Sequence, residues 1–168
     1  MVPIYIFDAS TFVHLSQIED YPNRNPLVKF IWKTPHAYIT PKILSEIRTK
    51  TSANSLLIYL LSRGLVKVEG VPSICYNTTR RLAKRHAAEL KVGFPHHGEL
   101  EGMALALWFS RKIGAISILF TSDEEALKIA DNILRSNTAG FALRTPELIG
   151  YLYRTGEITF DEAKIYLH

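Results

Sequence analysis

The chain alternates between short apolar runs, rich in β-branched and aromatic residues, and longer stretches with helical periodicity. The short runs are Ile4–Phe7, Ala37–Thr40, Leu65–Glu69, Ala115–Phe120 and Phe141–Leu143. Strands separated by helices are typical of βαβ units, in which neighbouring strands are parallel. We therefore expect an α/β fold: a three-layer α/β/α sandwich with a central, mostly parallel sheet.

Helix signals fill the segments between these runs. The expected helices cover residues 11–18, 26–32, 41–50, 51–63, 77–91, 98–112, 122–131, 146–154 and 160–167. Asn25, Asn77 and Ser122 are the expected caps, and Tyr21-Pro22-Asn23 is an expected break. No linker, repeat or low-complexity segment divides the chain. Residues 1–168 are therefore expected to form one domain that includes the helices at 146–167.

The composition excludes several classes of protein. The chain has 168 residues, of which 47% are hydrophobic and 21% charged, enough for one buried core and unlike a disordered segment. The longest strongly apolar run, Leu56–Leu61, is too short to span a membrane. Asp8 interrupts the apolar start, which argues against a signal peptide and favours the cytoplasm. Cys75 is the single cysteine, so an internal disulfide or a multi-cysteine zinc site is excluded.

Acidic residues gather where the expected strands end. In open parallel sheets, ligands bind beyond the carboxyl ends of the strands. Asp8 directly follows the first run, and Asp123 follows the fourth. Each alone is more often a helix cap, but together at one sheet edge they indicate a site, since a lone carboxylate there is costly to bury. Glu46 and Glu99, on neighbouring helices, are expected at the same edge, whereas Glu101 faces elsewhere on its helix.

Four carboxylates without a Cys/His set are the ligand chemistry of a hard cation. Mg²⁺ and Mn²⁺ prefer oxygen ligands and retain water molecules. Such a site holds phosphate oxygens and activates water for in-line displacement, with one metal ion or two.

Positive charge is mild overall but locally dense. The formal net charge is +4, which permits a polyanionic partner without requiring one. The densest basic cluster is Arg80, Arg81, Lys84, Arg85 and His86. A solvated helix face is the commoner explanation of such a cluster, and polyanion binding is the alternative.

Four stretches of the chain follow one family pattern in order and spacing: Ile4–Ser10, Ile43–Ile47, His97–Ala106 and Leu119–Ala126. They resemble the motifs of the PIN domain, the nuclease fold of VapC-type toxins and related prokaryotic ribonucleases. The second stretch resembles the family's helix with Glu-Ile, the third its Gly-Glu-x-Glu-Ala helix, and the fourth its Thr-x-Asp strand end. The tail, Leu148–Leu167, resembles the helical ending of some PIN subgroups.

The resemblance implies a metal-dependent endoribonuclease with Mg²⁺ or Mn²⁺. Metal-bound water would attack phosphorus in RNA, leaving a 5′-phosphate and a 3′-hydroxyl. The family's catalytic, metal-binding acids correspond to Asp8, Glu46, Glu99 and Asp123. Its supporting hydroxyl residues correspond to Ser10 and Thr121, and Glu101 competes with Glu99 for the metal role.

The resemblance also implies RNA as a partner. The candidate RNA-binding residues are Arg48, Lys50, Arg80, Arg81, Lys84 and Arg85. His96 and His97 are candidates for orienting RNA or a leaving group, although loop histidines more often have no such role. Some relatives are toxins of toxin–antitoxin pairs and many are dimers, so an antitoxin protein and a homodimer stay open as partners, with no membrane.

Three other functions compete with the nuclease. A non-catalytic PIN-like module for RNA binding or assembly would share the fold. A haloacid-dehalogenase-like phosphohydrolase needs a second Asp two residues after the first, where this chain has Ser10. A nucleotide-binding regulator would need a Gly-rich phosphate loop, which does not follow the first expected strand.

Overall fold

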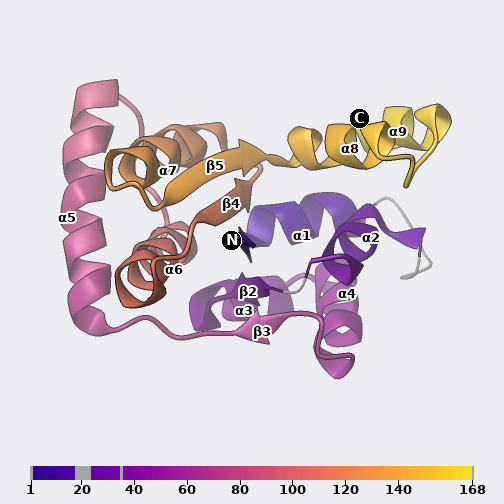
Figure 1. Ribbon diagram of the computed structural model, residues 1–168, viewed down its shortest axis with the longest axis horizontal. Coiled ribbons are helices and arrows are strands. Elements are labelled where there is room, and N and C mark those ends of the chain that lie inside the picture. Colours follow the sequence, from indigo (N-terminus) through magenta and orange to yellow (C-terminus); the bar gives the residue numbers. More distant parts are fainter. Residues whose placement is uncertain (1, 18–23, 35, 168) are drawn as a thin grey trace.

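A computed structural model describes residues 2–17, 24–34 and 36–167 of the chain. Its strands are β1 (Ile4–Phe7), β2 (Ala37–Ile39), β3 (Lys67–Val68), β4 (Ser117–Thr121) and β5 (Gly140–Arg144). They form one five-stranded sheet in the order β3-β2-β1-β4-β5, and every neighbouring pair is parallel. Helices cover both faces of this sheet (Figure 1), so the expected three-layer α/β fold is confirmed.

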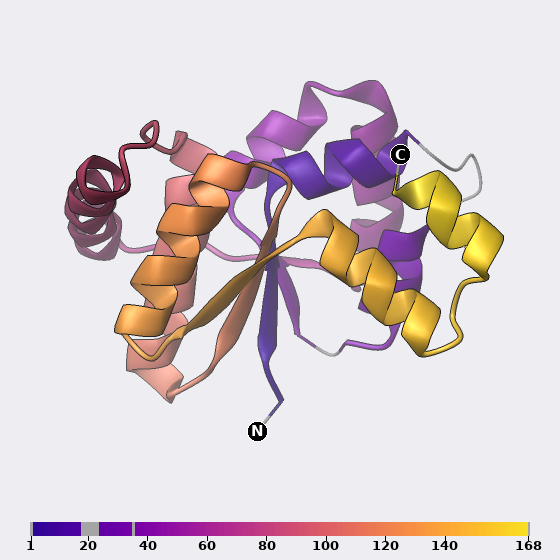
Figure 2. The ribbon, with the colours of Figure 1, turned by 90° about the horizontal axis from the view of Figure 1, so that it is seen from above.

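The helices lie where they were expected, except that the fifth begins at Ser73 rather than at Asn77 and the seventh continues to Ser136 rather than ending at Asp131. They are α1 (Ala9–Ser16), α2 (Pro26–Trp32), α3 (Pro41–Arg48), α4 (Thr51–Ser62), α5 (Ser73–Leu90), α6 (His97–Ile113), α7 (Glu124–Ser136), α8 (Thr145–Arg154) and α9 (Phe160–Tyr166). Figure 2 shows α5, α6 and α7 on one side of the sheet, and α1, α2, α8 and α9 on the other. No helix within the described ranges has the length and apolar character needed to cross a membrane.

Alternation along the strands builds two cores, one on each face. Ile6 of β1 and Leu119 of β4 belong to the core under α5, α6 and α7. Phe7 and Phe120, the next residue of each strand, belong to the opposite core. Their rings stack with centroids 5.4 Å apart, and the Phe30 ring meets Phe120 edge-on at 5.5 Å. The period-two pattern of a strand thus places apolar side chains on both faces of the sheet.

Helix caps depart from expectation at two places. Asn25 caps α2 as expected, by accepting a hydrogen bond from the Leu27 backbone N–H at 2.9 Å. However, α5 begins at Ser73 rather than at an Asn77 cap, because Pro72 already supplies the extended entry. Asp123, not Ser122, caps α7. The expected break at 21–23 lies outside the described residues.

The strand order creates a switch point between β1 and β4. From β1 the chain builds outward through β2 to β3, and then crosses over to place β4 and β5 on the other side of β1. The connections on the two sides of this point diverge, and in open parallel sheets ligands bind outside the carboxyl ends of the strands at such a point. Asp8 and Thr121 lie at this edge of the sheet, one residue beyond the paired Phe7 and Phe120.

Replacing Phe120 with Ala tests the aromatic core. The side chain is 2% exposed and packs against Phe7 and Phe30. Its truncation should lower the unfolding free energy by about 3–5 kcal/mol, because apolar burial is reduced and a cavity is left behind. Denaturant titration measures the change. Trp32→Ala is the control, because Trp32 is 63% exposed and its removal should cost less than about 1 kcal/mol. Equal losses would contradict the packing described here.

Candidate active site

Asp8 is fixed in place at the centre of the carboxyl edge. It is 3% exposed, and its backbone N–H donates to the Phe120 carbonyl at 2.9 Å. The Ser10 hydroxyl donates to Asp8 Oδ2 at 2.7 Å, and the Thr121 hydroxyl donates to the same oxygen at 3.1 Å. Burial raises the pKa of Asp8, and these hydrogen bonds offset only part of that shift. The carboxylate is therefore held rigidly in a poorly solvated position.

The two hydroxyls that hold Asp8 also shape the turn after β4. Ser10 Oγ accepts a hydrogen bond from the Ser122 backbone N–H at 2.8 Å. Thr121 Oγ1 accepts one from the Asp123 backbone N–H at 3.1 Å. Each hydroxyl thus links the end of β1 to the segment that carries the fourth acid.

Thr145 and Thr11 extend this hydroxyl network, and sequence reasoning missed both. The Ser122 hydroxyl is hydrogen-bonded to the Thr145 hydroxyl, which lies 3.3 Å from that of Thr11. Both threonines are fully buried. The signal was available: Thr145 directly follows β5, so its hydroxyl had to lie at the same sheet edge as Asp8.

Glu99 lies in the first turn of α6 and is almost fully buried. It is 7% exposed, and its Oε2 accepts a hydrogen bond from the His96 backbone N–H at 2.9 Å. Burial raises the pKa of Glu99 to about 8, with further contributions from the negative charges of Asp8, Asp123 and Glu46. The four acids therefore share one electrostatic environment.

Glu46 reaches this environment from the second turn of α3. Burial, followed by the charge of Asp8, raises the pKa of Glu46. Its carboxylate accepts a hydrogen bond from the Gly98 backbone and lies so close that a Cβ at Gly98 would be 2.5 Å from Oε2. Sequence reasoning placed Gly98 only at a helix start. The structure adds that the missing side chain leaves room for the second acid.

Asp123 combines two roles. Its Oδ1 accepts the Ala126 backbone N–H at 3.0 Å and caps α7, while its charge contributes to the raised pKa of Glu99. With Glu99 it lines an open cleft of about 600 Å³. The loop 93–96 and the start of α7 form the other walls. The helix-cap and active-site interpretations of Asp123 are therefore compatible.

The described hydrogen bonds to these acids come from neutral donors, and none of them is a salt bridge. In the described part of the chain, none of the four takes part in a salt bridge with Lys, Arg or His. No three His, Cys, Asp or Glu side chains among those described are arranged to hold a metal ion. The four carboxylates thus lie close enough to influence one another's charge, but they are not arranged around one common point.

The remaining candidates are divided between the acidic cleft and other surfaces. His96 lines the cleft together with Glu99 and Asp123. Glu101 faces a second pocket beside α5, where its Oε1 accepts the Lys42 backbone N–H at 3.1 Å. The six candidate RNA-binding residues are exposed and are not among the residues that line the acidic cleft. Four of them lie on α5, on the outer flank of the molecule (Figure 1), whereas Arg48 ends α3 and Lys50 lies just before α4.

Comparison with known proteins identifies no relative: no family model matches the chain, and neither does any curated protein.

The pH dependence of the stability of Glu99→Gln tests whether the pKa of Glu99 is raised in the folded protein. The carboxyl group has an ordinary pKa of 4.5 and a pKa of about 8 when folded. Between these values the folded protein holds a proton that the unfolded chain has released, so the unfolding free energy falls as pH rises. Gln cannot ionise, so Glu99→Gln should remove most of this decline and gain stability relative to wild type between pH 5 and pH 9. Melting temperatures across that range, without divalent cations, measure it.

Asp161→Asn is the matched control, because Asp161 is exposed on α9 and pairs with a lysine rather than a histidine. It should leave the pH dependence of wild type unchanged. A Glu99→Gln variant whose melting temperature runs parallel to that of wild type across the range would contradict the raised pKa of Glu99.

Proposed function

We propose that this protein is a divalent-metal-dependent ribonuclease of PIN type, which hydrolyses phosphodiester bonds in RNA. The observation that carries the proposal is the gathering of four acids at the switch point between β1 and β4: Asp8 and Glu99 are buried, Asp123 lines a cleft with Glu99, and Glu46 packs against Gly98. The resemblance of the surrounding motifs to PIN domains supports it independently. A role as the toxin of a toxin–antitoxin pair rests on that resemblance alone.

The donor set fits a hard cation. All four side chains offer carboxylate oxygens, the ligands that Mg²⁺ and Mn²⁺ prefer. Their mutual repulsion contributes to the raised pKa of Glu99, and a dication would relieve it. When bound, the cation would supply Lewis-acid chemistry, neutralising charge on phosphate oxygens and lowering the pKa of a water molecule. The proposal requires the four side chains to turn toward a common ion.

The residues of the chain have distinct tasks in the reaction. Asp8 anchors the site, because two hydroxyls and a 3% exposed environment fix its orientation. The other acids complete the negative pocket from α3, α6 and the start of α7. Water attacks phosphorus, the bond to the 3′-oxygen breaks, and that oxygen takes a proton, giving a 5′-phosphate and a 3′-hydroxyl. A carboxylate of the site accepts the proton that the water loses.

Asp8→Asn tests catalysis directly. Asn keeps the size of the side chain and removes its charge, so the fold should survive while the cation loses an anionic ligand. Cleavage of a mixed library of single-stranded and structured RNA, with Mg²⁺ or Mn²⁺, should fall by about 100-fold or more in turnover. EDTA should abolish cleavage by wild type. Asp161→Asn, which removes an exposed carboxylate on α9, is the control and should cleave like wild type.

Two results would overturn the proposal. Equal cleavage by wild type and Asp8→Asn would mean that the activity comes from a contaminant. If neither protein cleaves any member of the library but both bind RNA, the non-catalytic PIN-like module replaces the nuclease.

The basic residues of α5 provide a separate test of RNA binding. Arg80, Arg81, Lys84 and Arg85 are exposed on this helix. If they neutralise phosphates, replacing all four with Ala should weaken RNA binding and reduce the salt slope by about 0.7 for each phosphate that is no longer neutralised. Fluorescence anisotropy at several salt concentrations measures both.

A control variant removes the same charge elsewhere, at Arg111, Lys112, Arg154 and Lys164. It should bind RNA like wild type. If both variants lose affinity equally, net charge explains the effect; if neither does, α5 presents only a solvated face.

A further inference from the structure

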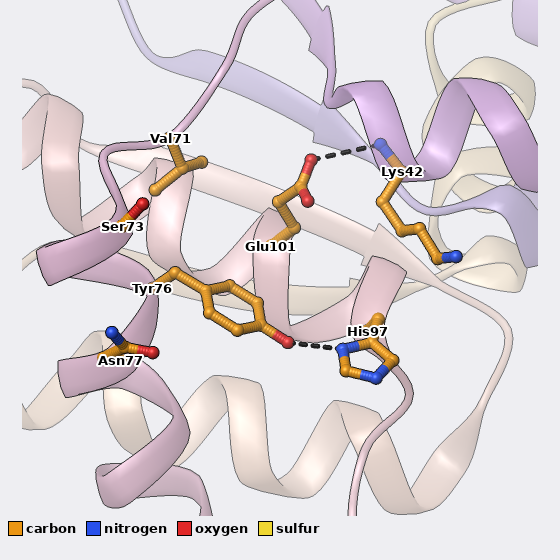
Figure 3. Close-up of a pocket in the computed structure, with 7 residues that line it drawn as sticks. All are labelled: Lys42, Val71, Ser73, Tyr76, Asn77, His97 and Glu101. Carbon is orange, nitrogen blue, oxygen red and sulfur yellow. Dashed lines mark hydrogen bonds between the residues drawn. The ribbon is translucent and has the colours of Figure 1, made fainter.

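A second pocket adjoins the acidic site and is lined by a different kind of side chain. It has a volume of about 570 Å³ and lies between the start of α3, the start of α5 and the start of α6. Figure 3 shows Lys42, Tyr76, Asn77, His97 and Glu101 around it. The nuclease chemistry proposed above uses none of these side chains.

Tyr76 and His97 form a flat aromatic surface in this pocket. The two ring planes differ by only 18°, and their centroids are 6.3 Å apart. The Tyr76 hydroxyl and His97 Nδ1 are 2.6 Å apart in a hydrogen bond that joins the edges of the rings (Figure 3). The rings therefore lie side by side rather than face to face. Burial raises the pKa of Tyr76, so its phenol stays neutral in this hydrogen bond.

Polar groups with unused hydrogen-bonding capacity surround this surface. The Ser73 hydroxyl and the Asn77 amide make no side-chain hydrogen bond to any described residue. Glu101 uses Oε1 to accept the Lys42 backbone N–H, and its other oxygen is not bonded in this way. Donors and acceptors beside an aromatic face are the combination that recognises an unstacked nucleobase.

Two helices connect the pocket to the acids. Lys42 lies one turn before Glu46 on α3, and its positive charge partly counters the rise in the pKa of Glu46. On α6, His97 and Glu101 are one turn apart and line the pocket, whereas Glu99 lies between them in sequence and lines the acidic cleft. The start of α6 therefore contributes to both pockets, because His96 lines the acidic cleft and His97 lines this one.

We propose that this pocket is a nucleobase subsite, in which one base of a single-stranded RNA stacks on the Tyr76–His97 surface beside the phosphate to be cleaved. The inference rests on the proposed nuclease function and deepens it, because it makes the substrate single-stranded at the cleavage point. Lys42 contacts the phosphate between the two nucleotides. Asn77 and Glu101 meet the edge of the base.

The test uses the full chain with Asp8→Asn, which prevents cleavage during binding. The probe is a fluorescein-labelled single-stranded RNA of eight nucleotides, alongside a set of the same strand with one abasic residue at each position. Adding Tyr76→Ala should weaken binding of the intact strand about tenfold, the effect of removing one stacking interaction. At one position of the strand, an abasic residue should weaken binding to the Asp8→Asn protein by a similar factor. The same abasic residue should not weaken binding further when the protein also carries Tyr76→Ala.

Two further variants separate stacking from other effects. Tyr76→Phe keeps the ring and should retain most of the affinity, and Tyr76→Leu keeps bulk without a π face and should behave like Ala. Tyr153→Ala removes a partly exposed tyrosine on α8 and should not affect binding. Unchanged affinity in Tyr76→Ala, or an equal loss for every abasic strand with and without Tyr76, would overturn the subsite.

A separate readout distinguishes this failure from failure of the nuclease proposal. With Asp8 intact, Mn²⁺ should raise the melting temperature of Tyr76→Ala as much as that of wild type. If Mn²⁺ stabilises both but Tyr76→Ala binds RNA normally, only the subsite is wrong. If Mn²⁺ stabilises neither, the nuclease proposal fails.

Discussion

The placement of acidic side chains at a poorly solvated edge of the sheet is the constraint on which the site depends: burial raises the pKa of Asp8, Glu46 and Glu99, and repulsion between the acids adds to the rise for Glu46 and Glu99. Each of the four acids accepts a hydrogen bond from a neutral group: hydroxyls for Asp8, and backbone N–H groups for Glu46, Glu99 and Asp123. Neutral donors position a carboxylate but leave its negative charge largely uncompensated. An added positive charge would therefore stabilise the site, and either a proton on Glu99 or a bound cation can supply it.

The topology of the sheet brings these acids together. Asp8 and Asp123 arrive at the same edge because β1 and β4 are parallel neighbours that end at the same level. The crossover from β3 to β4 then brings α6, with Glu99 in its first turn, across to that edge. The same placement puts His97 and Glu101 beside the start of α5. Two pockets of different chemistry thus share one helix start.

The sequence predicted the fold and the placement of Asp8 and Asp123 well, because both depend on local patterns and on the parallel sheet edge. Features that depend on contacts between distant segments could not be predicted from local sequence patterns. The space at Gly98 is explained only by Glu46 packing against it, and the hydroxyl contact of Thr11 with Thr145 joins residues far apart in the chain. Glu101 was correctly separated from Glu99 by helix periodicity, but its pocket requires Tyr76 from α5. Ser122 was a plausible cap by residue type, yet its hydroxyl is bonded to Thr145, and Asp123 caps α7.

The central claim is that Asp8, Glu46, Glu99 and Asp123 converge on a divalent cation. Crystals soaked in Mn²⁺, with diffraction data collected at the manganese absorption edge, test this most directly. We predict one or two anomalous peaks at the carboxyl edge between β1 and β4, within coordination distance of these carboxylates. Ordered carboxylates with no peak beside them, or a peak held only by other residues, would contradict it.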